Sequence, residues 1–141
     1  MINNILLCLI LLAPCVVLGQ QSLLDETPIQ TVNRIMNDYV KQQTDNQDID
    51  ENKFAMTTAL YALQDSADKK DFDILLKTWL NYSPPNYPTR KLIEPIFYKD
   101  KVSAIEKINE LISHNDTYAG RNSMPGSDLV FLREKIFNYK N

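Results

Sequence analysis

Both cysteines of this 141-residue chain, Cys8 and Cys15, lie within its first fifteen residues. Both fall inside an apolar run over residues 5–18 that only Pro14 interrupts. If this run is removed, the remaining chain of about 120 residues contains no disulfide and must be held together by its hydrophobic core. A chain of that length is sufficient for one such core. The sequence therefore predicts a single domain over residues 20–141.

The apolar run itself has the features of a cleaved secretory signal. It is too short to span a bilayer comfortably, since a membrane helix needs roughly twenty apolar residues. Val17 and Gly19 stand where a signal peptidase requires small or tolerated residues. We therefore expect residues 1–19 to be a signal peptide, Gln20 to be the mature N-terminus, and the protein to be secreted and extracellular.

Glycine is scarce after residue 19, where only Gly120 and Gly126 occur. A β-rich domain with many tight turns normally contains more, because several turn types require a positive φ. Apolar residues instead recur every three or four positions, which is the periodicity of amphipathic helices. The sequence predicts an all-α fold: a small irregular helical bundle, or stacked helical hairpins, of five to six short helices.

Capping residues and prolines mark where these helices begin and end. Thr27 is expected to cap the first, with Pro28 at its first helical position. Asp100 and Ser127 are expected to cap the last two, and Pro95 should kink or shorten the helix that contains it. The predicted apolar stripes comprise Ile29, Val32, Met36, Tyr39, Val40, Phe54, Met56, Ala59, Leu60, Leu63, Phe72, Leu75, Leu76, Trp79, Leu80, Leu92, Ile93, Ile96, Phe97, Val102, Ile105, Ile108, Leu111, Ile112, Leu129, Leu132, Ile136 and Tyr139.

A weak internal echo bears on the choice between a bundle and stacked hairpins. The pair Lys70-Asp71 opens one apolar stripe, and the pair Lys99-Asp100 opens another 29 residues later. This spacing favours stacked hairpins. Two copies with so few matched positions do not define a repeat family.

Two polar segments, residues 42–52 and 114–126, are predicted to connect helices. The acidic residues of the first invite a calcium-binding interpretation. An EF-hand that began at Asp48, however, would place Lys53 where glycine makes the turn and Ala59 where a glutamate closes the site. We therefore expect a solvated linker and no metal site there.

Residues suited to catalysis are sparse. His114 is the only histidine, and with no cysteine after residue 19 a zinc site lacks its usual ligands. We expect His114 to act as a cation at a helix C-terminus. No glycine-flanked nucleophilic serine and no glycine-rich phosphate loop are present. Two carboxylates would suffice for a hydrolase, but a helical domain this small seldom has a cleft that desolvates them. We expect no catalytic residues, no cofactor and no enzyme activity.

Two sites satisfy the acceptor pattern for N-glycosylation. Asn81 is followed by Ser83 at the third position, and Asn115 by Thr117. Both sites fall at predicted helix ends or loops, where a sugar is tolerated. Pro84 directly follows the first site, so the second is favoured.

Aromatic residues gather around the segment of residues 83–88, which we call the proline segment because three of its residues are prolines. Three prolines exclude a helix there. Such a cluster is either core beneath the segment, which is the commoner arrangement, or an exposed recognition patch. Aromatic anchors dominate protein interfaces, so we take it as the candidate interaction patch. Its residues are Trp79, Tyr82, Tyr87, Phe97 and Tyr98.

In overall organisation the chain resembles small inducible humoral proteins of insects, such as the Turandot stress proteins. The shared features are a cysteine-bearing leader and a cysteine-free helical mature part. The resemblance includes no common motif, and the glycine-rich stretch that those proteins carry near their end is absent here. Insect odorant carriers are also helical and secreted, but they depend on paired cysteines that this chain lacks.

The net charge of −3, with lysines and arginines scattered, does not favour nucleic acid or anionic membrane as a partner. The leading hypothesis is a secreted, non-enzymatic protein-interaction factor of the humoral, seminal, salivary or venom type, which binds an unidentified extracellular protein. The alternatives are an extracellular carrier of a small apolar ligand and a stress-induced humoral protein of the Turandot type.

Overall fold

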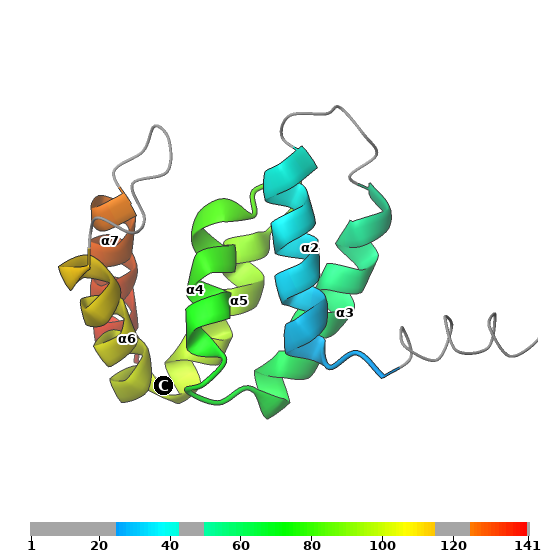
Figure 1. The fold of residues 1–141 in the computed structure, drawn as a ribbon. Helices are drawn as coiled ribbons and strands as arrows, with labels where there is room; N and C mark the ends of the chain where they lie inside the picture. The colour runs from blue at the N-terminus through cyan, green and yellow to red at the C-terminus, as the bar shows by residue number, and fades with distance from the viewer. Residues whose placement is uncertain (1–24, 43–49, 115–124, 141) are drawn as a thin grey trace, which may run out of the picture.

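The computed structural model describes residues 25–42, 50–114 and 125–140, and these residues form six helices with no strand among them. The predicted all-α class is confirmed (Figure 1). The predicted signal peptide and its cleavage site lie outside the described residues. The helices are α2 (Pro28–Gln42), α3 (Asp50–Ser66), α4 (Phe72–Asn81), α5 (Thr89–Lys99), α6 (Lys101–Ser113) and α7 (Pro125–Asn138).

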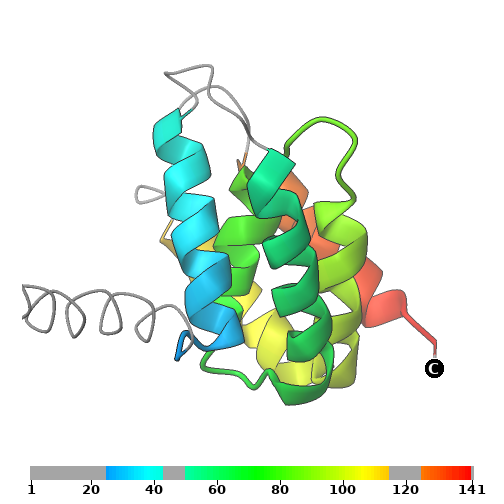
Figure 2. The same cartoon turned by 90° about the vertical axis from the view of Figure 1, so that its right-hand side faces the viewer.

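The helices pack as three successive hairpins: α2 with α3, α4 with α5, and α6 with α7. The first helices of the hairpins contact one another in order, α2 with α4 and α4 with α6, and the second helices do the same, α3 with α5 and α5 with α7. Two rows of helices result, which Figures 1 and 2 show from two sides. The described residues thus form a small helical bundle in which successive helical hairpins stack.

The first helices of the three hairpins share one burial pattern. Each buries residues at positions i, i+4 and i+7, so that one face of the helix meets the core. The equivalent residues are Val32, Met36 and Tyr39 in α2; Leu75 and Trp79 in α4 with Tyr82 at its C-cap; and Ala104, Ile108 and Leu111 in α6. Asp71 and Asp100, the acidic residues of the sequence echo, directly precede α4 and α6. Each stands four residues before the first buried residue of this pattern in its helix. The echo therefore marks equivalent helix starts.

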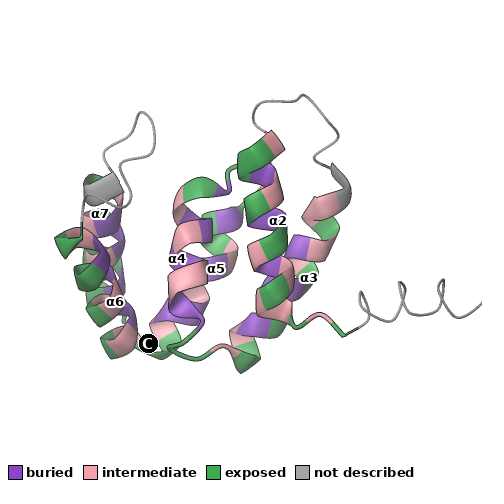
Figure 3. Ribbon diagram, viewed as in Figure 1, coloured by how far each residue is buried: buried purple, intermediate pink, exposed green. Residues whose placement is uncertain are grey.

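Most residues of the predicted stripes lie in or against one continuous core. Figure 3, in which the ribbon is coloured by burial, shows buried residues interspersed with exposed ones along the helices. Leu76, a predicted stripe residue, is buried in this core. Ile35 is buried there as well but was not predicted. Four stripe residues were predicted wrongly, because their side chains face solvent. They are Val40, Phe54, Val102 and Tyr139.

Two of the predicted caps are confirmed. At the start of α2, Thr27 Oγ1 accepts a hydrogen bond from the backbone N–H of Gln30 (3.4 Å), and Gln30 Oε1 accepts one from the N–H of Thr27 (2.9 Å). This reciprocal pair is a capping box. At the start of α6, Asp100 Oδ1 accepts a hydrogen bond from the N–H of Ser103 (3.1 Å). Each cap satisfies a helix N–H that has no partner within the helix.

Three predicted boundaries were wrong. Helix α7 begins at Pro125, so Ser127 lies inside it and does not cap it. Helix α3 begins at Asp50, so the predicted linker ends earlier than residue 52; residues 43–49 lie outside the described part. Pro95 does not end α5, which continues to Lys99. Proline removes a single helical hydrogen bond, and packing on both sides outweighs that loss here.

The proline segment is not helical, as predicted. The backbone N–H of Tyr87 donates to the carbonyl oxygen of Pro84 (3.3 Å), which closes a four-residue turn. Asn86 has a φ of 58°, as the third residue of a type II turn requires, and Pro85 supplies the fixed φ of the second. This turn reverses the chain between α4 and α5 and brings their aromatic residues together.

Candidate functional site

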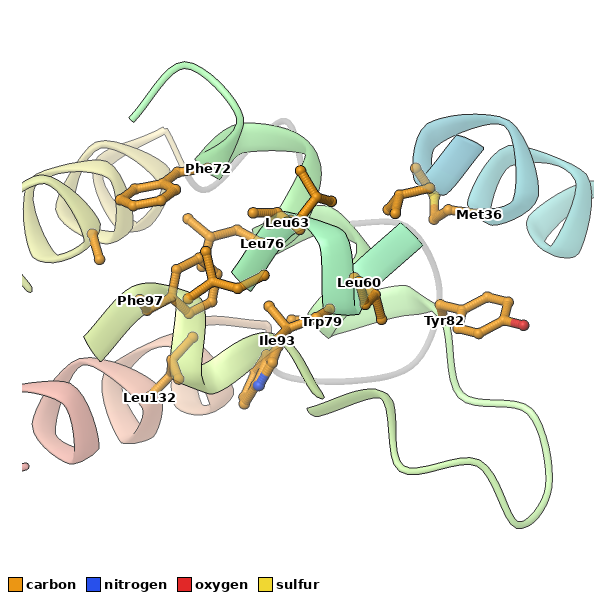
Figure 4. Close-up of a cluster of buried hydrophobic side chains, with 14 of the residues drawn as sticks. Met36, Leu60, Leu63, Phe72, Leu76, Trp79, Tyr82, Ile93, Phe97 and Leu132 are labelled. Atoms are coloured by element: carbon orange, nitrogen blue, oxygen red, sulfur yellow. The ribbon is translucent and has the colours of Figure 1, made fainter. Parts of the chain in front are cut away.

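The candidate interaction patch is corrected by the burial of its residues. Trp79, Tyr82 and Phe97 are each no more than 1% exposed and belong to the hydrophobic core, while Tyr87 and Tyr98 are half-buried against it. Figure 4 shows most of these side chains among the aliphatic core residues of neighbouring helices. Trp79, Tyr82 and Phe97 therefore do not form an exposed patch, while Tyr87 and Tyr98 are partly exposed. The aromatic cluster is the core between the second hairpin and its neighbours.

Three tyrosines connect this core to the proline segment. The rings of Tyr39 and Tyr82 meet edge to face, with centroids 4.9 Å apart, and the rings of Tyr82 and Tyr87 do the same at 5.6 Å. The hydroxyl groups of Tyr87 and Thr57 lie 2.9 Å apart, which is a hydrogen bond to α3. The proline segment is thus held against both the first and the second hairpin.

Burial raises the pKa of the Tyr82 phenol well above its ordinary value, and it also raises the pKa of Tyr87. Burial, and then the nearby carboxylate of Glu94, raise the pKa of Tyr98 to about 12. A raised pKa favours the neutral, protonated phenol. All three hydroxyl groups therefore keep their protons in neutral solution and are available as hydrogen-bond donors.

Glu94 is the buried carboxylate with the most contacts in the described part of the chain. Its Oε1 accepts a hydrogen bond from Trp79 Nε1 (3.3 Å), and its Oε2 accepts bonds from the Tyr98 hydroxyl (3.3 Å) and from Lys135 Nζ. The guanidinium of Arg90 lies over the Trp79 ring, 4.0 Å from its centroid. The carboxylate is thus engaged on both oxygens, as a structural buried charge requires.

These contacts belong to a row between α5 and α7. Arg90 donates to Asp128 (2.8 Å), Glu94 pairs with Lys135, and the rings of Tyr98 and Tyr139 stack with centroids 3.8 Å apart. Arg90, Glu94 and Tyr98 are spaced by four residues and share one face of α5. Their partners follow in the same order along α7, so the two helices run in the same direction. The row ties the third hairpin to the second.

Exposed aromatic residues that sequence reasoning missed lie on α3 and on α7, where Phe131 is 62% and Phe137 is 74% exposed. The two on α7 are six residues apart and so lie on different faces of the helix, whereas those on α3 share a face. Phe54 is 81% exposed and Tyr61 is 57% exposed, with the exposed Thr58 between them. Seven residues are two helical turns, so Phe54 and Tyr61 share one face. We call Phe54, Thr58 and Tyr61 the α3 stripe. The opposite side of the helix buries the residues Met56, Leu60 and Leu63. In the sequence, Phe54 and Tyr61 are marked only by their spacing of seven residues, which places them on a different helix face from Met56, Leu60 and Leu63.

Of the two predicted glycosylation sites, the structure describes only the one at Asn81. Asn81 is exposed at the end of α4, and its side-chain amide donates to the carbonyl oxygen of Lys77 (2.9 Å). Ser83, the third residue of that pattern, is exposed as well. Asn115 lies outside the described residues. Occupancy of either site stays a prediction.

His114 caps the C-terminus of α6, where its Nδ1 lies 2.7 Å from the carbonyl oxygen of Glu110. This is the expected position, while its charge there stays a prediction. Within residues 25–42, 50–114 and 125–140 no three His, Cys, Asp or Glu side chains are grouped closely enough to hold a metal ion. Among the helices described, none is both long and apolar enough for a membrane span.

Two hollows open to solvent on the described surface. One, of about 370 Å³, is lined by Pro95, Tyr98, Lys99 and Tyr139, and so lies at the end of the row between α5 and α7. The other, of about 270 Å³, is lined by residues 82–84 and 87–91. We call the second the α5 hollow, because it lies at the start of that helix.

Comparison with known protein families, with curated proteins and with solved structures finds no match to this chain.

Proposed function

We propose that this protein is a secreted, non-enzymatic factor that binds another extracellular protein through the α3 stripe. The exposure of Phe54 and Tyr61 carries this proposal. Large aromatic side chains are costly to leave in water, and they are the commonest anchors of protein interfaces. Secretion is proposed from the apolar leader over residues 1–19.

The geometry of the α3 stripe fits one recurring mode of recognition. An exposed helix face with anchors at positions i, i+4 and i+7 inserts into an apolar groove of a partner. Phe54, Thr58 and Tyr61 have this spacing, and all three are exposed. The same helix is fixed to the molecule through its buried face, against α2 and α5. The stripe is therefore presented on a rigid element, which lowers the entropy lost on binding.

The polar contacts of the core support a binding role over a catalytic one. Glu94 is occupied by Trp79, Tyr98 and Lys135, so it is not poised to exchange a proton with a substrate. The two hollows described above open to solvent, whereas a carrier of an apolar ligand encloses most of that ligand's surface. These features favour recognition at the surface.

The proposal is tested with a variant that removes both anchors, Phe54→Ala with Tyr61→Ala. The purified protein is immobilised, partners are captured from extracellular fluid of the source, and the affinity of each purified partner is then measured. We expect the double variant to bind its partner roughly 30-fold more weakly or worse, the loss typical of interface anchors. Its free energy of unfolding should change by no more than about 0.5 kcal/mol for each exposed residue.

Phe131→Ala is the matched control, because Phe131 is also an exposed phenylalanine but lies on α7. It should leave the affinity unchanged. If the double variant binds as tightly as the wild type, the α3 stripe is not the interface. If the control loses affinity equally, the interface lies elsewhere on the surface.

A further inference from the structure

Two buried hydroxyl groups in the described part of the chain have no hydrogen-bond partner: the Tyr82 phenol and Thr89 Oγ1. Tyr82 is 1% exposed and Thr89 is 3% exposed. Buried polar groups are nearly always hydrogen-bonded, because an unpaired one has lost its water without compensation. Two such groups at one place are satisfied by solvent or by a ligand, since neither has a partner in the described part of this chain.

Both residues line the α5 hollow. Figure 4 shows the hydroxyl end of Tyr82 pointing away from the core side chains. Thr89 is the first residue of α5, so the same hollow also contains the start of a helix. The two unpaired hydroxyl groups come from different elements, one from the end of α4 and one from α5. Both residues line one hollow because the proline segment reverses the chain between them.

The start of α5 adds further donors. The residue before it, Pro88, supplies no side-chain cap. The N–H of Leu92 donates to the carbonyl oxygen of Pro88 (3.2 Å), but the N–H groups of Arg90 and Lys91 have no acceptor among the described residues. Such N–H groups, together with the helix dipole, favour a negative charge. The side chain of Lys91 adds an exposed cation at the same hollow.

We propose that the α5 hollow is a binding site for a small organic anion, whose carboxylate or phosphate oxygens accept hydrogen bonds from Tyr82, Thr89 and the start of α5. Every polar group assigned to the site is a donor. The raised pKa of Tyr82 keeps its hydroxyl protonated for that role. The remaining walls consist of Pro84, Tyr87 and Pro88, which suit a compact hydrocarbon body, and of the polar Ser83. This site goes beyond the proposed interaction at the α3 stripe and does not depend on it.

The probes are benzoate, phenyl phosphate and the neutral benzamide, titrated into ¹⁵N-labelled protein. We expect a saturable shift of the amide resonances of Arg90 and Lys91 with at least one of the two anions. Comparison of the anions distinguishes a carboxylate site from a phosphate site. Benzamide should bind more weakly, because its amide carries no charge. Equal binding of benzamide, or no saturable shift with either anion, overturns the proposal.

Two conservative variants separate ligand binding from a structural role: Tyr82→Phe and Thr89→Val. Each removes one unpaired hydroxyl and keeps the shape of the side chain, so the melting temperature should stay unchanged or rise. Each should weaken binding of the anion roughly 5-fold, the value of about one hydrogen bond. Unchanged affinity in both variants would contradict the proposal, and so would a marked fall in both melting temperatures.

Thr78→Val is the matched control. Thr78 is as buried as Thr89, but its Oγ1 already donates to the carbonyl oxygen of Ile74 (2.8 Å). This variant should bind the anion as the wild type does. A loss of affinity equal to that of Thr89→Val would show that the effect is a general loss of structure, and would overturn the assignment of the hydroxyl to the ligand.

Discussion

Replacing Phe97 by alanine is expected to lower the free energy of unfolding by about 3–5 kcal/mol, the usual cost of emptying a packed aromatic site. Phe97 is 0% exposed, and its ring meets that of Phe72 edge to face with centroids 5.4 Å apart. It lies on α5, the helix that contacts α3, α4, α6 and α7. Since small domains are stable by only about 5–15 kcal/mol, this one change removes a large share of the total. Urea unfolding followed by circular dichroism measures it.

Phe54→Ala is the matched control for this prediction. The chemical change is the same, but the side chain is 81% exposed. It should alter the free energy of unfolding by no more than about 0.5 kcal/mol. A loss below about 1 kcal/mol for Phe97→Ala, or similar losses for the two variants, would mean that α5 does not form the centre of the stack.

The second large effect is expected at Glu94 and Lys135. Lys135→Met leaves the buried carboxylate without its cation and should cost about 1–3 kcal/mol, since hydrogen bonds to charged groups are worth more than neutral ones. Adding Glu94→Gln removes the charge that was left unpaired and should recover part of the loss. The double-mutant cycle should therefore give a coupling energy of about 1–3 kcal/mol between the two residues.

The pair Lys70 and Asp68 is the control for that cycle. Its side chains are 77% and 54% exposed, whereas the side chain of Glu94 is 9% exposed. Exposed pairs are worth about 0–1 kcal/mol, because water screens the charges and two long side chains must be ordered. The coupling between Lys70 and Asp68 should therefore be near zero. Equal coupling in both pairs would contradict the claim that the row of contacts between α5 and α7 stabilises the packing of the third hairpin on the second.

The helices could be predicted because their signals are local. Periodic apolar residues, Thr27 before Pro28, and Asp100 before α6 act within one or two turns of the chain. Boundaries were wrong where a local rule had competitors: at Pro125, proline itself starts a helix, and at Pro95 tertiary packing outweighs the loss of one hydrogen bond. The echo at Asp71 and Asp100 correctly favoured stacked hairpins.

The sites were harder to predict, because they depend on which face of a helix turns inward. Helix α3 has apolar residues on two faces, and periodicity alone does not tell that Met56 is buried while Phe54 is exposed. The row between α5 and α7 joins residues 38 and 41 positions apart, such as Arg90 with Asp128 and Glu94 with Lys135. The unpaired hydroxyl groups of the α5 hollow could not be predicted, because whether a hydroxyl is paired depends on the positions of all neighbouring donors and acceptors in the fold.

The central claim is that Trp79, Tyr82 and Phe97, around the proline segment, belong to the core of the stack and do not form an exposed patch that binds a protein. Trp79 is the only tryptophan of the chain, so its fluorescence reports on this core directly. It is 1% exposed, with its indole N–H bonded to Glu94.

The measurement is quenching of Trp79 fluorescence by acrylamide, in the native protein and in urea. We expect blue-shifted emission and quenching that is several-fold weaker in the native state, in the wild type and equally in the variant with Phe54→Ala and Tyr61→Ala. Native emission and quenching that match those of the urea-unfolded chain would place Trp79 in solvent and contradict the account.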